Sequence, residues 1–384
     1  MFSSCTKIYK NNVIIDEVIT NGRIIATWIT YSEINDLLYS VNSEKDFKLI
    51  VDDKISILSE YSINTIFLHI RAFDDAYYKS ILYLVNKNCL DEDGNLKFDV
   101  LQTFIDVCKK YNIEIHGWIN PYRIRNDSNV ELINKHTLAS NFINLNNDEG
   151  IIITENNIYY NPSNVEVQRY ILNGVKEIIE NYDVAGVHID DYFYPTTSKE
   201  IDKKLYADYF NNGGCLSLDD YRRYNVTSLV SSIYTSLKSY DNDLVFSISP
   251  RGDIEQNYCD YYADVKLWLS KDGYADYIIP QIYFGYSHEK MPFEQVLYEW
   301  LKYDDGSKLV IGLGLYKSGL IDDYSSGYNE WIENDNVVSR QICDVLNNSC
   351  CGYSIFSASY LYSECNNPTL HLERQNIRNT LANR

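Results

Sequence analysis

Short apolar runs rich in β-branched residues recur along the chain, and stretches with a helical spacing of apolar positions separate them. Runs of this length bounded by turn residues are typical of buried strands. Strands that alternate with helices predict parallel pairing through helical crossovers. We count eight runs, at residues 23–30, 64–73, 113–122, 184–193, 244–250, 275–284, 308–317 and 352–359. Eight repeats predict an α/β fold, a single closed (β/α)8 TIM barrel.

Two segments between these runs show the helical pattern most clearly. Residues 163–183 carry apolar side chains at three- and four-residue steps, and Ser163 with Glu166 has the spacing of a capping box. A second helix is expected over residues 218–239. The longest gap, between the third and fourth runs, predicts an elaborated loop over the barrel mouth. No linker or repeat divides the chain, so we expect one catalytic domain, residues 21–384, after an N-terminal extension, residues 1–20.

Composition restricts the class of partner. The chain of 384 residues has 34 Lys and Arg against 54 Asp and Glu, a formal net charge of −20. Such a charge repels nucleic acids and anionic lipid surfaces, which favours a neutral or cationic substrate. The 36 tyrosines far exceed ordinary usage. Their rings suit the apolar faces of sugars, so we expect a polysaccharide substrate and no nucleic-acid partner.

Cysteines and the N-terminus bear on the compartment. The nine cysteines form no C-x-x-C pair, which predicts reduced, mostly buried thiols rather than a disulfide framework or a zinc site. The first 20 residues contain no apolar segment typical of a signal peptide, and no run is long enough to span a bilayer. The printed sequence is therefore expected to be cytoplasmic and not inserted in a membrane. Removal of a signal peptide would leave the same pattern, so a location outside the membrane stays open.

Polar and aromatic residues gather where the predicted strands end. In a (β/α)8 barrel the active site lies at the C-terminal ends of the strands. The tryptophans and tyrosines there suit stacking on sugar rings, and the arginines and amides suit hydrogen bonds to hydroxyl or acetamido groups. The expected substrate-binding residues are Trp28, Arg71, Trp118, Asn120, Tyr122, Arg123, His188, Tyr192, Tyr194, Arg251, Gln281, Tyr283 and Tyr316.

The fourth run ends in two adjacent acids, in the sequence "VAGVHIDDYFYP". Alternation along the strand turns Val187 and Ile189 towards the helices, which leaves His188 and Asp190 pointing into the barrel. Asp191 begins the following loop. Paired carboxyl groups with aromatic company are what glycoside hydrolysis requires, because one acid protonates the leaving oxygen while the other attacks the sugar or activates water. Asp190 is the leading candidate for the nucleophile or transition-state stabiliser.

Five motifs follow one another at these strand ends: "HGWINPYR", "GVHIDDYFYP", "SISPRG", "PQIYFG" and "IGLGLYK". In this order they resemble the bacterial glycosyl-hydrolase-like family 10, over nearly the whole chain from about Arg23 to Leu361. The segments "ATWITYSEIN" and "SPRGDIEQNY" further resemble its branch in low-GC Gram-positive bacteria. The resemblance implies a TIM-barrel glycosidase that acts on peptidoglycan glycan strands stripped of their peptides.

The resemblance also implies roles for four acids. Asp190 and Asp191 match the acidic pair of the family directly. Asp75 in "RAFDDAYY" stands at the aspartate of the family pattern R-P-x-x-D-A-x-Y, with Ala72 where proline is usual. Glu33 matches an acidic position after the first strand. Asp191, Asp75 and Glu33 are therefore alternatives for the acid/base role beside Asp190.

Two other functions remain open. The sixth strand end offers Gln281 rather than an acid, which leaves room for a catalytically silent glycan-binding barrel. An aspartate pair near a histidine also fits a metal-dependent polysaccharide deacetylase. The six histidines include no H-x-x-x-H pair, however, and "GLGLYKSG" lacks the G-x-G-x-x-G spacing of a dinucleotide site. We therefore expect no metal and no cofactor.

Overall fold

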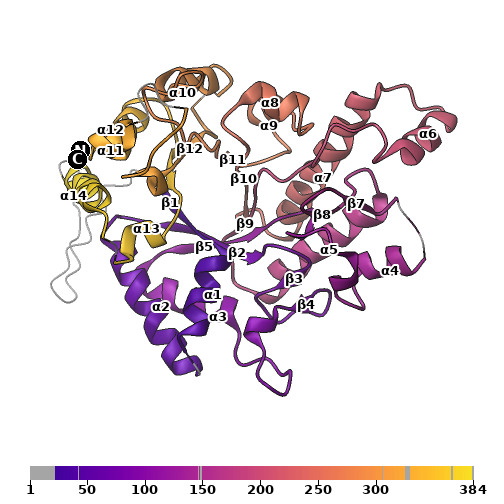
Figure 1. Cartoon of the computed structure of the whole chain (residues 1–384), viewed down its shortest axis with the longest axis horizontal. Coiled ribbons are helices and arrows are strands. Elements are labelled where there is room, and N and C mark those ends of the chain that lie inside the picture. Colours follow the sequence, from indigo (N-terminus) through magenta and orange to yellow (C-terminus); the bar gives the residue numbers. More distant parts are fainter. Residues whose placement is uncertain are drawn as a thin grey trace, which may run out of the picture.

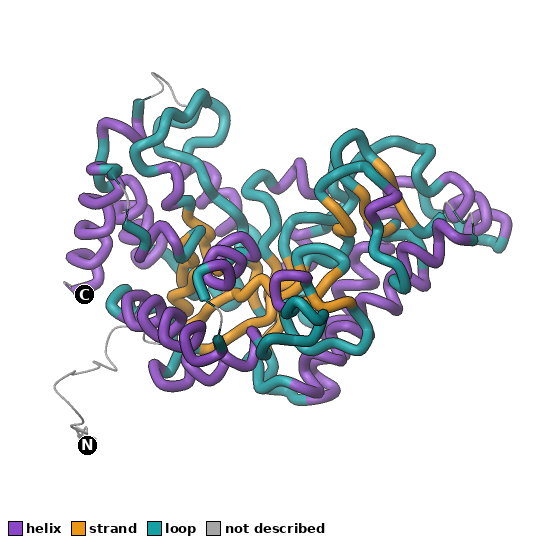
Figure 2. The backbone as a smooth tube through the Cα atoms, turned by 60° about the horizontal axis from the view of Figure 1, so that its bottom comes forward, coloured by secondary structure: helices purple, strands orange, loops and turns teal. Residues whose placement is uncertain are grey.

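The computed structural model describes residues 22–382 except residues 42, 146, 148, 305, 325–328 and 365. The predicted N-terminal extension lies outside these residues. Strands gather at the centre of the molecule and helices surround them (Figures 1 and 2). The eight central strands are β1 (Ile24–Ile29), β2 (Thr65–Arg71), β5 (Glu114–Ile119), β9 (Gly186–Ile189), β10 (Val245–Ile248), β11 (Tyr277–Ile278), β12 (Val310–Leu313) and β13 (Gly352–Ile355).

The eight strands pair in parallel in the order β11-β10-β9-β5-β2-β1-β13-β12. Single parallel bridges, between Ile278 and Leu309 and between Gln281 and Gly312, join β11 to β12 and bring the sheet nearly to closure. A Cβ at Gly312 would lie 2.9 Å from the backbone oxygen of Pro280, so glycine permits this close approach. The predicted (β/α)8 barrel and all eight predicted strands are confirmed.

Helices occupy the connections between the strands and pack around the barrel (Figure 1). Of these helices, α5 and α7 correspond to the two that the sequence predicted. No helix of the described chain is both long enough and apolar enough to cross a membrane. The helices are α1 (Tyr31–Tyr39), α2 (Glu44–Ser59), α3 (Val100–Cys108), α4 (Leu138–Asn144), α5 (Val165–Asn181), α6 (Lys203–Asn211), α7 (Leu218–Tyr240), α8 (Ile254–Cys259), α9 (Val265–Ser270), α10 (Phe293–Leu301), α11 (Glu330–Glu333), α12 (Val337–Asn347), α13 (Ser359–Tyr362) and α14 (Pro368–Ala382).

The start of α5 differs from the prediction by one residue. The capping side chain is that of Asn164, which accepts hydrogen bonds from the backbone nitrogens of Glu166 and Val167. The predicted cap, Ser163, instead places its hydroxyl 2.5 Å from the hydroxyl of Tyr194. Both residue types cap helices well, and a contact with a distant segment decided between them.

Side chains on alternate strand positions fill two separate regions. The outward positions, such as Val187 and Ile189 of β9, pack against the helices in the main apolar core. The inward positions form a smaller cluster inside the barrel, which consists of Ala26, Trp28, Phe67, Trp118, Ile279 and Val310. The predicted inward direction of His188 is confirmed by its ring, which stacks on Phe67 at 4.1 Å.

Two connections near the barrel mouth carry small sheets of their own. The connection between β2 and β5 contains the parallel pair β3 (Asp75–Ala76) and β4 (Leu84–Val85). The predicted elaborated loop between the third and fourth strands contains the antiparallel sheet β6-β8-β7, from β6 (Arg123–Arg125), β7 (Ile151–Ile153) and β8 (Ile158–Tyr160), together with α4. This sheet is the second group of strands in Figure 2. Short 3-10 helices lie at Lys87–Cys89, Lys109–Tyr111, Val130–Leu132 and Leu315–Lys317.

Candidate active site

A cavity of about 180 Å³ lies at the C-terminal ends of the barrel strands. Its wall is formed by β1, β2, β5 and β6 and by the segments that follow β1, β9, β10, β11 and β13, which is where the fold places an active site. Its lining consists of Trp28, Thr30, Tyr31, His69, Trp118, Arg123, Asp190, Asp191, Tyr192, Ser249, Gln281, Tyr283 and Phe356. The predicted site residues among them are Trp28, Trp118, Arg123, Asp190, Asp191, Tyr192, Gln281 and Tyr283.

Asp190 is buried at the end of β9, with 2% of its surface exposed. Its Oδ2 accepts a hydrogen bond from Trp118 Nε1 at 3.1 Å and a long one from Asn120 Nδ2 at 3.5 Å. No described residue donates a hydrogen bond to its Oδ1. Burial raises the pKa of Asp190 to about 8, and the charge of Asp191 adds to the rise. At neutral pH Asp190 therefore keeps its proton.

Asp191 lines the same cavity from the start of the following loop. Its Oδ2 lies 3.1 Å from Arg251 Nε. Arg251 is held over the ring of Tyr261, with 4.4 Å between the guanidinium carbon and the ring centroid. Burial raises the pKa of Asp191, whereas the charge of Arg251 and a hydrogen bond with Gln281 oppose the rise. Because the cation favours the ionised form, Asp191 is the member of the pair that carries the negative charge.

Aromatic rings form much of the cavity wall. The rings of Tyr283 and Phe356 lie 5.6 Å apart at a tilt of 31°. The guanidinium of Arg123 lies between two further rings, 4.6 Å from the centroid of Phe73 and 4.4 Å from that of Tyr192. This packing holds an extended cationic side chain in one position at the rim. The wall therefore combines flat apolar surfaces with fixed polar groups, as a sugar-binding site requires.

His188 supports the cavity from the barrel interior. Its Nδ1 lies 2.8 Å from Ser247 Oγ, and its Nε2 lies 2.9 Å from Ser249 Oγ. Trp28 Nε1 also donates to His188 Nε2, at 3.1 Å. Burial lowers the pKa of His188 well below its usual value, so the ring is neutral. His188 was predicted to bind substrate, but the structure places it beneath the lining residues, where it fixes Trp28.

Arg71 was predicted at the site, and the structure turns it away from the cavity. A shift in the pairing of β2 with β5 falls between His69 and Arg71, and such bulges redirect the side chains that follow. The guanidinium donates to the backbone oxygen of Asn120 at 2.8 Å and lies over the ring of Tyr83. It lies 3.9 Å from Asp74. Arg71 thus holds the segment behind the site in place.

Other predicted site residues stand just outside the lining. Asn120 approaches Asp190 from behind, and its side-chain oxygen accepts from the backbone nitrogen of Arg123 at 3.1 Å. Tyr122 is fully buried, which raises the pKa of its hydroxyl. Tyr316 meets the edge of Tyr283, with ring centroids 5.8 Å apart. These side chains support the residues that line the cavity.

Asp75 lines a different cavity, of about 100 Å³, next to the first. Phe73 separates the two, because it also lines the smaller cavity and packs on Arg123 and on Tyr31 of the larger one. Asn86 Nδ2 donates to Asp75 Oδ2 at 2.8 Å. Burial raises the pKa of Asp75 to about 6. The structure therefore does not bring Asp75 into one cavity with the acid pair.

Glu33 does not line the cavity of the acid pair either. It is the third residue of α1 and completes a capping box with Thr30, whose backbone nitrogen donates to Glu33 Oε2 at 2.6 Å. Its Oε1 accepts from Ser357 Oγ at 3.0 Å and from the backbone nitrogen of Ser359 at 2.6 Å. Both oxygens are thus engaged in joining the start of α1 to the segment after β13.

Five lining residues were not in the predicted set: Thr30, Tyr31, His69, Ser249 and Phe356. Thr30, Tyr31 and Ser249 stand at or directly after the end of a predicted strand, so strand-end position was the available signal for them. His69 and Phe356 lie further inside the predicted runs. His69 is the most informative of the five. Both of its ring nitrogens lack a hydrogen-bond partner within the described chain.

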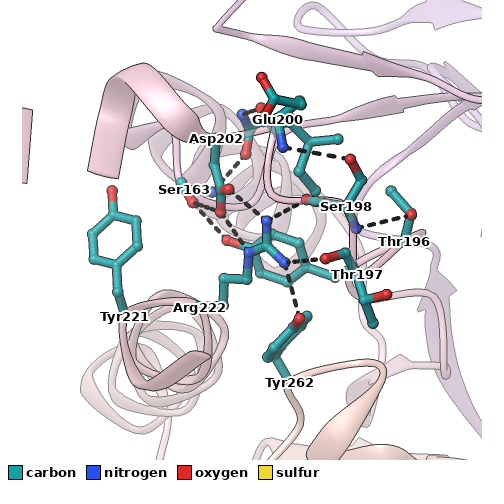
Figure 3. Close-up of polar contacts among 12 residues, drawn as sticks. Ser163, Thr196, Thr197, Ser198, Glu200, Asp202, Tyr221, Arg222 and Tyr262 are labelled. Carbon is teal, nitrogen blue, oxygen red and sulfur yellow. Dashed lines mark hydrogen bonds and ion pairs between the residues drawn. The ribbon is translucent and has the colours of Figure 1, made fainter. Parts of the chain in front are cut away.

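The loop after β9 is held at its far end by a buried ion pair (Figure 3). Arg222 of α7 donates from Nε and Nη2 to the two oxygens of Asp202, at 2.7 and 2.6 Å. It also donates to the hydroxyl of Tyr262 at 2.9 Å, and its guanidinium lies 5.3 Å from the ring centroid of Tyr194. Tyr194 was predicted to bind substrate, but its ring packs beside this ion pair instead. We refer to Asp202, Arg222, Tyr262 and Tyr194 together as the clamp. The clamp fixes the segment that begins with Asp191.

Other features of the described residues lie apart from this chemistry. A larger groove, of about 550 Å³, runs along the outer helices α5 and α7 and is lined largely by serine and threonine. Within the described part of the chain, no group of three or more His, Cys, Asp or Glu side chains is arranged to hold a metal ion. The acid pair at the barrel mouth is thus the best-defined site.

Comparison with known proteins shows the family of the chain. The model of the family described as glycosyl hydrolase-like 10 matches residues 23–323. The chain belongs to the glycosyl hydrolase-like 10 family. It is 29% identical over 304 residues to glycosyl hydrolase YngK of Bacillus subtilis, and 28% identical over 291 residues to glycosyl hydrolase DigH of Escherichia coli. These matches cover 72% and 70% of this chain but only 57% and 65% of the relatives, so the chain spans about three fifths of their length.

Solved structures with this fold include several glycosidases. An α-L-fucosidase from Paenibacillus thiaminolyticus superposes with a TM-score of 0.59 at 12% identity, over 93% of this chain and 48% of that one. The PgaB glycoside hydrolase domain from Bordetella bronchiseptica superposes with a TM-score of 0.52 at 9% identity, over 92% and 98% of the two chains. At these identities the likeness concerns the fold, and it agrees with the (β/α)8 barrel.

Proposed function

We propose that this protein is a glycoside hydrolase that cleaves O-glycosyl bonds in an amino-sugar polysaccharide of the bacterial cell wall. The observation that carries the proposal is the acid pair itself. Asp190 and Asp191 share one aromatic-lined cavity, and Oδ1 of the buried Asp190 has no hydrogen-bond partner among the described residues. Peptide-stripped peptidoglycan strands are the favoured substrate, because the sequence motifs resemble a family with relatives that act on them.

The environments of the two carboxyl groups suggest their roles. With a pKa raised to about 8, Asp190 is protonated at neutral pH, and its Oδ1 is free to donate the proton to the glycosidic oxygen. The C–O bond then breaks and positive charge develops at the anomeric carbon. Asp191, ionised beside Arg251, stabilises that charge. Water then adds to the anomeric carbon, and a carboxylate of the pair takes up the proton that the water releases. This assignment exchanges the roles that the sequence alone favoured.

The wall of the cavity accounts for substrate binding. Rings such as Trp118 and Tyr283 present flat faces to a sugar, whereas Arg123 and Gln281 offer donors to its hydroxyl or acetamido groups. With the net charge of −20, such a site favours a glycan without dense negative charge. Asp75 and Glu33 stand outside this scheme, since neither lines the cavity.

Mass spectrometry of the products tests the proposal. Wild type, Asp190→Asn and the exposed control Asp183→Asn are incubated with intact and with peptide-stripped peptidoglycan. We expect wild type and the control to shorten the stripped strands and Asp190→Asn to be about 10³-fold slower at an unchanged melting temperature. Unchanged strand length with loss of acetyl groups would indicate a deacetylase, and binding without any chemical change would indicate a silent glycan-binding barrel.

A second substrate assigns the roles within the pair. An aryl glycoside with a good leaving group needs little protonation, so it should restore turnover to Asp190→Asn far more than to Asp191→Asn. The reverse order of rescue would return the acid role to Asp191.

A further inference from the structure

One buried histidine of the cavity remains without an assigned task. His69 lies near the end of β2 on an inward position, with 3% of its surface exposed. The pairing of β2 with β5 places it directly opposite Trp118. The two rings stack with their centroids 3.5 Å apart at an angle of 9°, and Tyr31 meets the imidazole edge-on. The ring of His69 is therefore fixed, and it lines the cavity beside Trp118.

The fixed ring has no hydrogen-bond partner for either nitrogen within the described chain. Leaving a buried polar group in this condition destabilises a fold, so such positions call for an explanation. His188, two strands away in the same barrel, meets two serine hydroxyls and an indole nitrogen with its ring nitrogens. The contrast indicates that the partner of His69 is brought into the cavity by a ligand.

The charge state of His69 narrows the chemistry of that ligand. Burial lowers the pKa of His69 well below its usual value, and the charge of Arg123 acts in the same direction. The imidazole is therefore neutral, with one nitrogen that donates and one that accepts. A sugar hydroxyl can both donate and accept, so it satisfies either nitrogen.

We propose that His69 binds a hydroxyl group of the sugar unit that lies in the cavity and thereby positions it against the acid pair. The inference rests on the proposed function and adds a specificity-determining contact to it. Trp118 links the two groups physically, because its ring face covers His69 while its Nε1 donates to Asp190 at 3.1 Å. The sugar that satisfies His69 is thus held beside the carboxyl group that donates the proton.

Two substitutions separate this role from a structural one. His69→Phe keeps an aromatic ring against Trp118 but removes both nitrogens, whereas His69→Gln restores a donor and an acceptor. His116→Phe is the control, because His116 is equally buried, at 2%, does not line the cavity, and has its Nε2 3.9 Å from Glu114 Oε2. A purely structural histidine would make His69→Phe less stable. The proposal expects its melting temperature to be no lower than that of wild type.

The binding experiment uses peptide-stripped peptidoglycan strands and the Asp190→Asn protein, in which binding is separated from cleavage. We expect His69→Phe in that background to weaken binding roughly tenfold, His69→Gln to recover part of it, and His116→Phe to leave it unchanged. In proteins with Asp190 intact, kcat/KM should fall by a similar factor. Equal binding by the His69→Phe protein would overturn the inference alone. No binding by the Asp190→Asn protein would overturn the inference together with the proposed substrate.

Discussion

Asp190 and Asp202 stand at opposite ends of one loop, and both are buried, with 2% of their surface exposed. Asp202 receives two hydrogen bonds from Arg222 and a third from Ser163, at 3.3 Å. From the residues that the structure describes, Asp190 receives hydrogen bonds only on Oδ2, from the neutral donors Trp118 and Asn120, and it faces the charge of Asp191. Equal burial thus produces a satisfied ion pair at one end of the loop and an acid with a strongly raised pKa at the other.

The difference shows that burial by itself does not mark a catalytic carboxyl group. A buried charge is tolerated when a cation and hydrogen bonds replace its water, and Asp202 meets that condition. Asp190 forms no ion pair with the described residues, and burial with the charge of Asp191 outweighs the opposing charge of Arg123, so the protonated form is favoured. The clamp at Asp202 holds the loop that carries Asp191, whereas Asp190 is left with the proton that glycoside cleavage needs.

The pH dependence of stability gives the largest expected contrast. The pKa of Asp190 rises from 3.8 in the unfolded chain to about 8 in the fold, so the folded state binds more protons between these values. Its stabilising contribution is complete below pH 4 and is lost as pH rises towards 8, by up to about 1.4 kcal/mol per pH unit. Urea unfolding of Asp190→Asn should therefore show a stability advantage over wild type that grows from pH 4 to pH 8.

The exposed control Asp183→Asn should follow the wild-type pH dependence throughout this range, since its carboxylate is 79% exposed beside Lys109. A constant difference between Asp190→Asn and wild type would mean that Asp190 is ionised in the fold, and the comparison with Asp202 would lose its basis.

Removing the cation of the Arg222–Asp202 ion pair, at the far end of the loop from Asp190, is expected to lower the stability of the fold. Arg222→Met leaves Asp202 buried without its cation, which should lower the free energy of unfolding by about 3–5 kcal/mol. Lys203→Met, in the first turn of α6, removes a surface pair with Glu200, in which the two side chains are 72% and 74% exposed, and should cost at most about 1 kcal/mol. Equal losses in urea unfolding would show that the clamp is no stronger than a surface pair.

The strands and the direction of Asp190 could be predicted from the sequence, whereas the partners of Asp202 could not. The eight strands could be predicted from apolar runs, because a parallel strand that is buried on both faces is apolar at nearly every position. The inward direction of Asp190 follows from alternation. The partners of Asp202 could not be predicted, since Arg222 reaches it from the neighbouring α7 and Ser163 from the start of α5. The cap of α5 is Asn164, whereas the hydroxyl of Ser163 is engaged with Tyr194 and Asp202.

Within the site, local irregularities account for the remaining differences. The pairing shift after His69 turns Arg71 out of the cavity, and no residue pattern announces such a bulge. His69 was not in the predicted set, and only the three-dimensional surroundings of its ring nitrogens show that they lack partners within the described chain. The structural role of Glu33, in contrast, could have been predicted, because Thr30 and Glu33 have the spacing of a capping box in the sequence itself.

Removing the cation beside Asp191 should change activity more than stability. Arg251 opposes the rise of the Asp191 pKa, so Arg251→Gln lets that pKa rise further. The acidic limb of the kcat/KM profile, which requires ionised Asp191, should then move to higher pH, while the alkaline limb near pH 8 stays in place. Lys266→Gln, which removes a partner of Glu255 outside the cavity, serves as the control. An unmoved acidic limb would separate Asp191 from the reaction.

The smallest effect is expected for Glu33→Gln. A structural role of Glu33 predicts a loss of stability with normal turnover, whereas a catalytic role predicts a loss of turnover. Glutamine retains one acceptor oxygen but loses the charge, so Glu33→Gln weakens the hydrogen bonds from the backbone nitrogens of Thr30 and Ser359. The expected cost is about 1 kcal/mol in urea unfolding, with kcat/KM within twofold of wild type. Glu44→Gln, in the first turn of α2 and exposed, should change neither quantity. A large loss of turnover in a stably folded Glu33→Gln protein would instead make Glu33 a second acid of the site, because no capping role requires its proton.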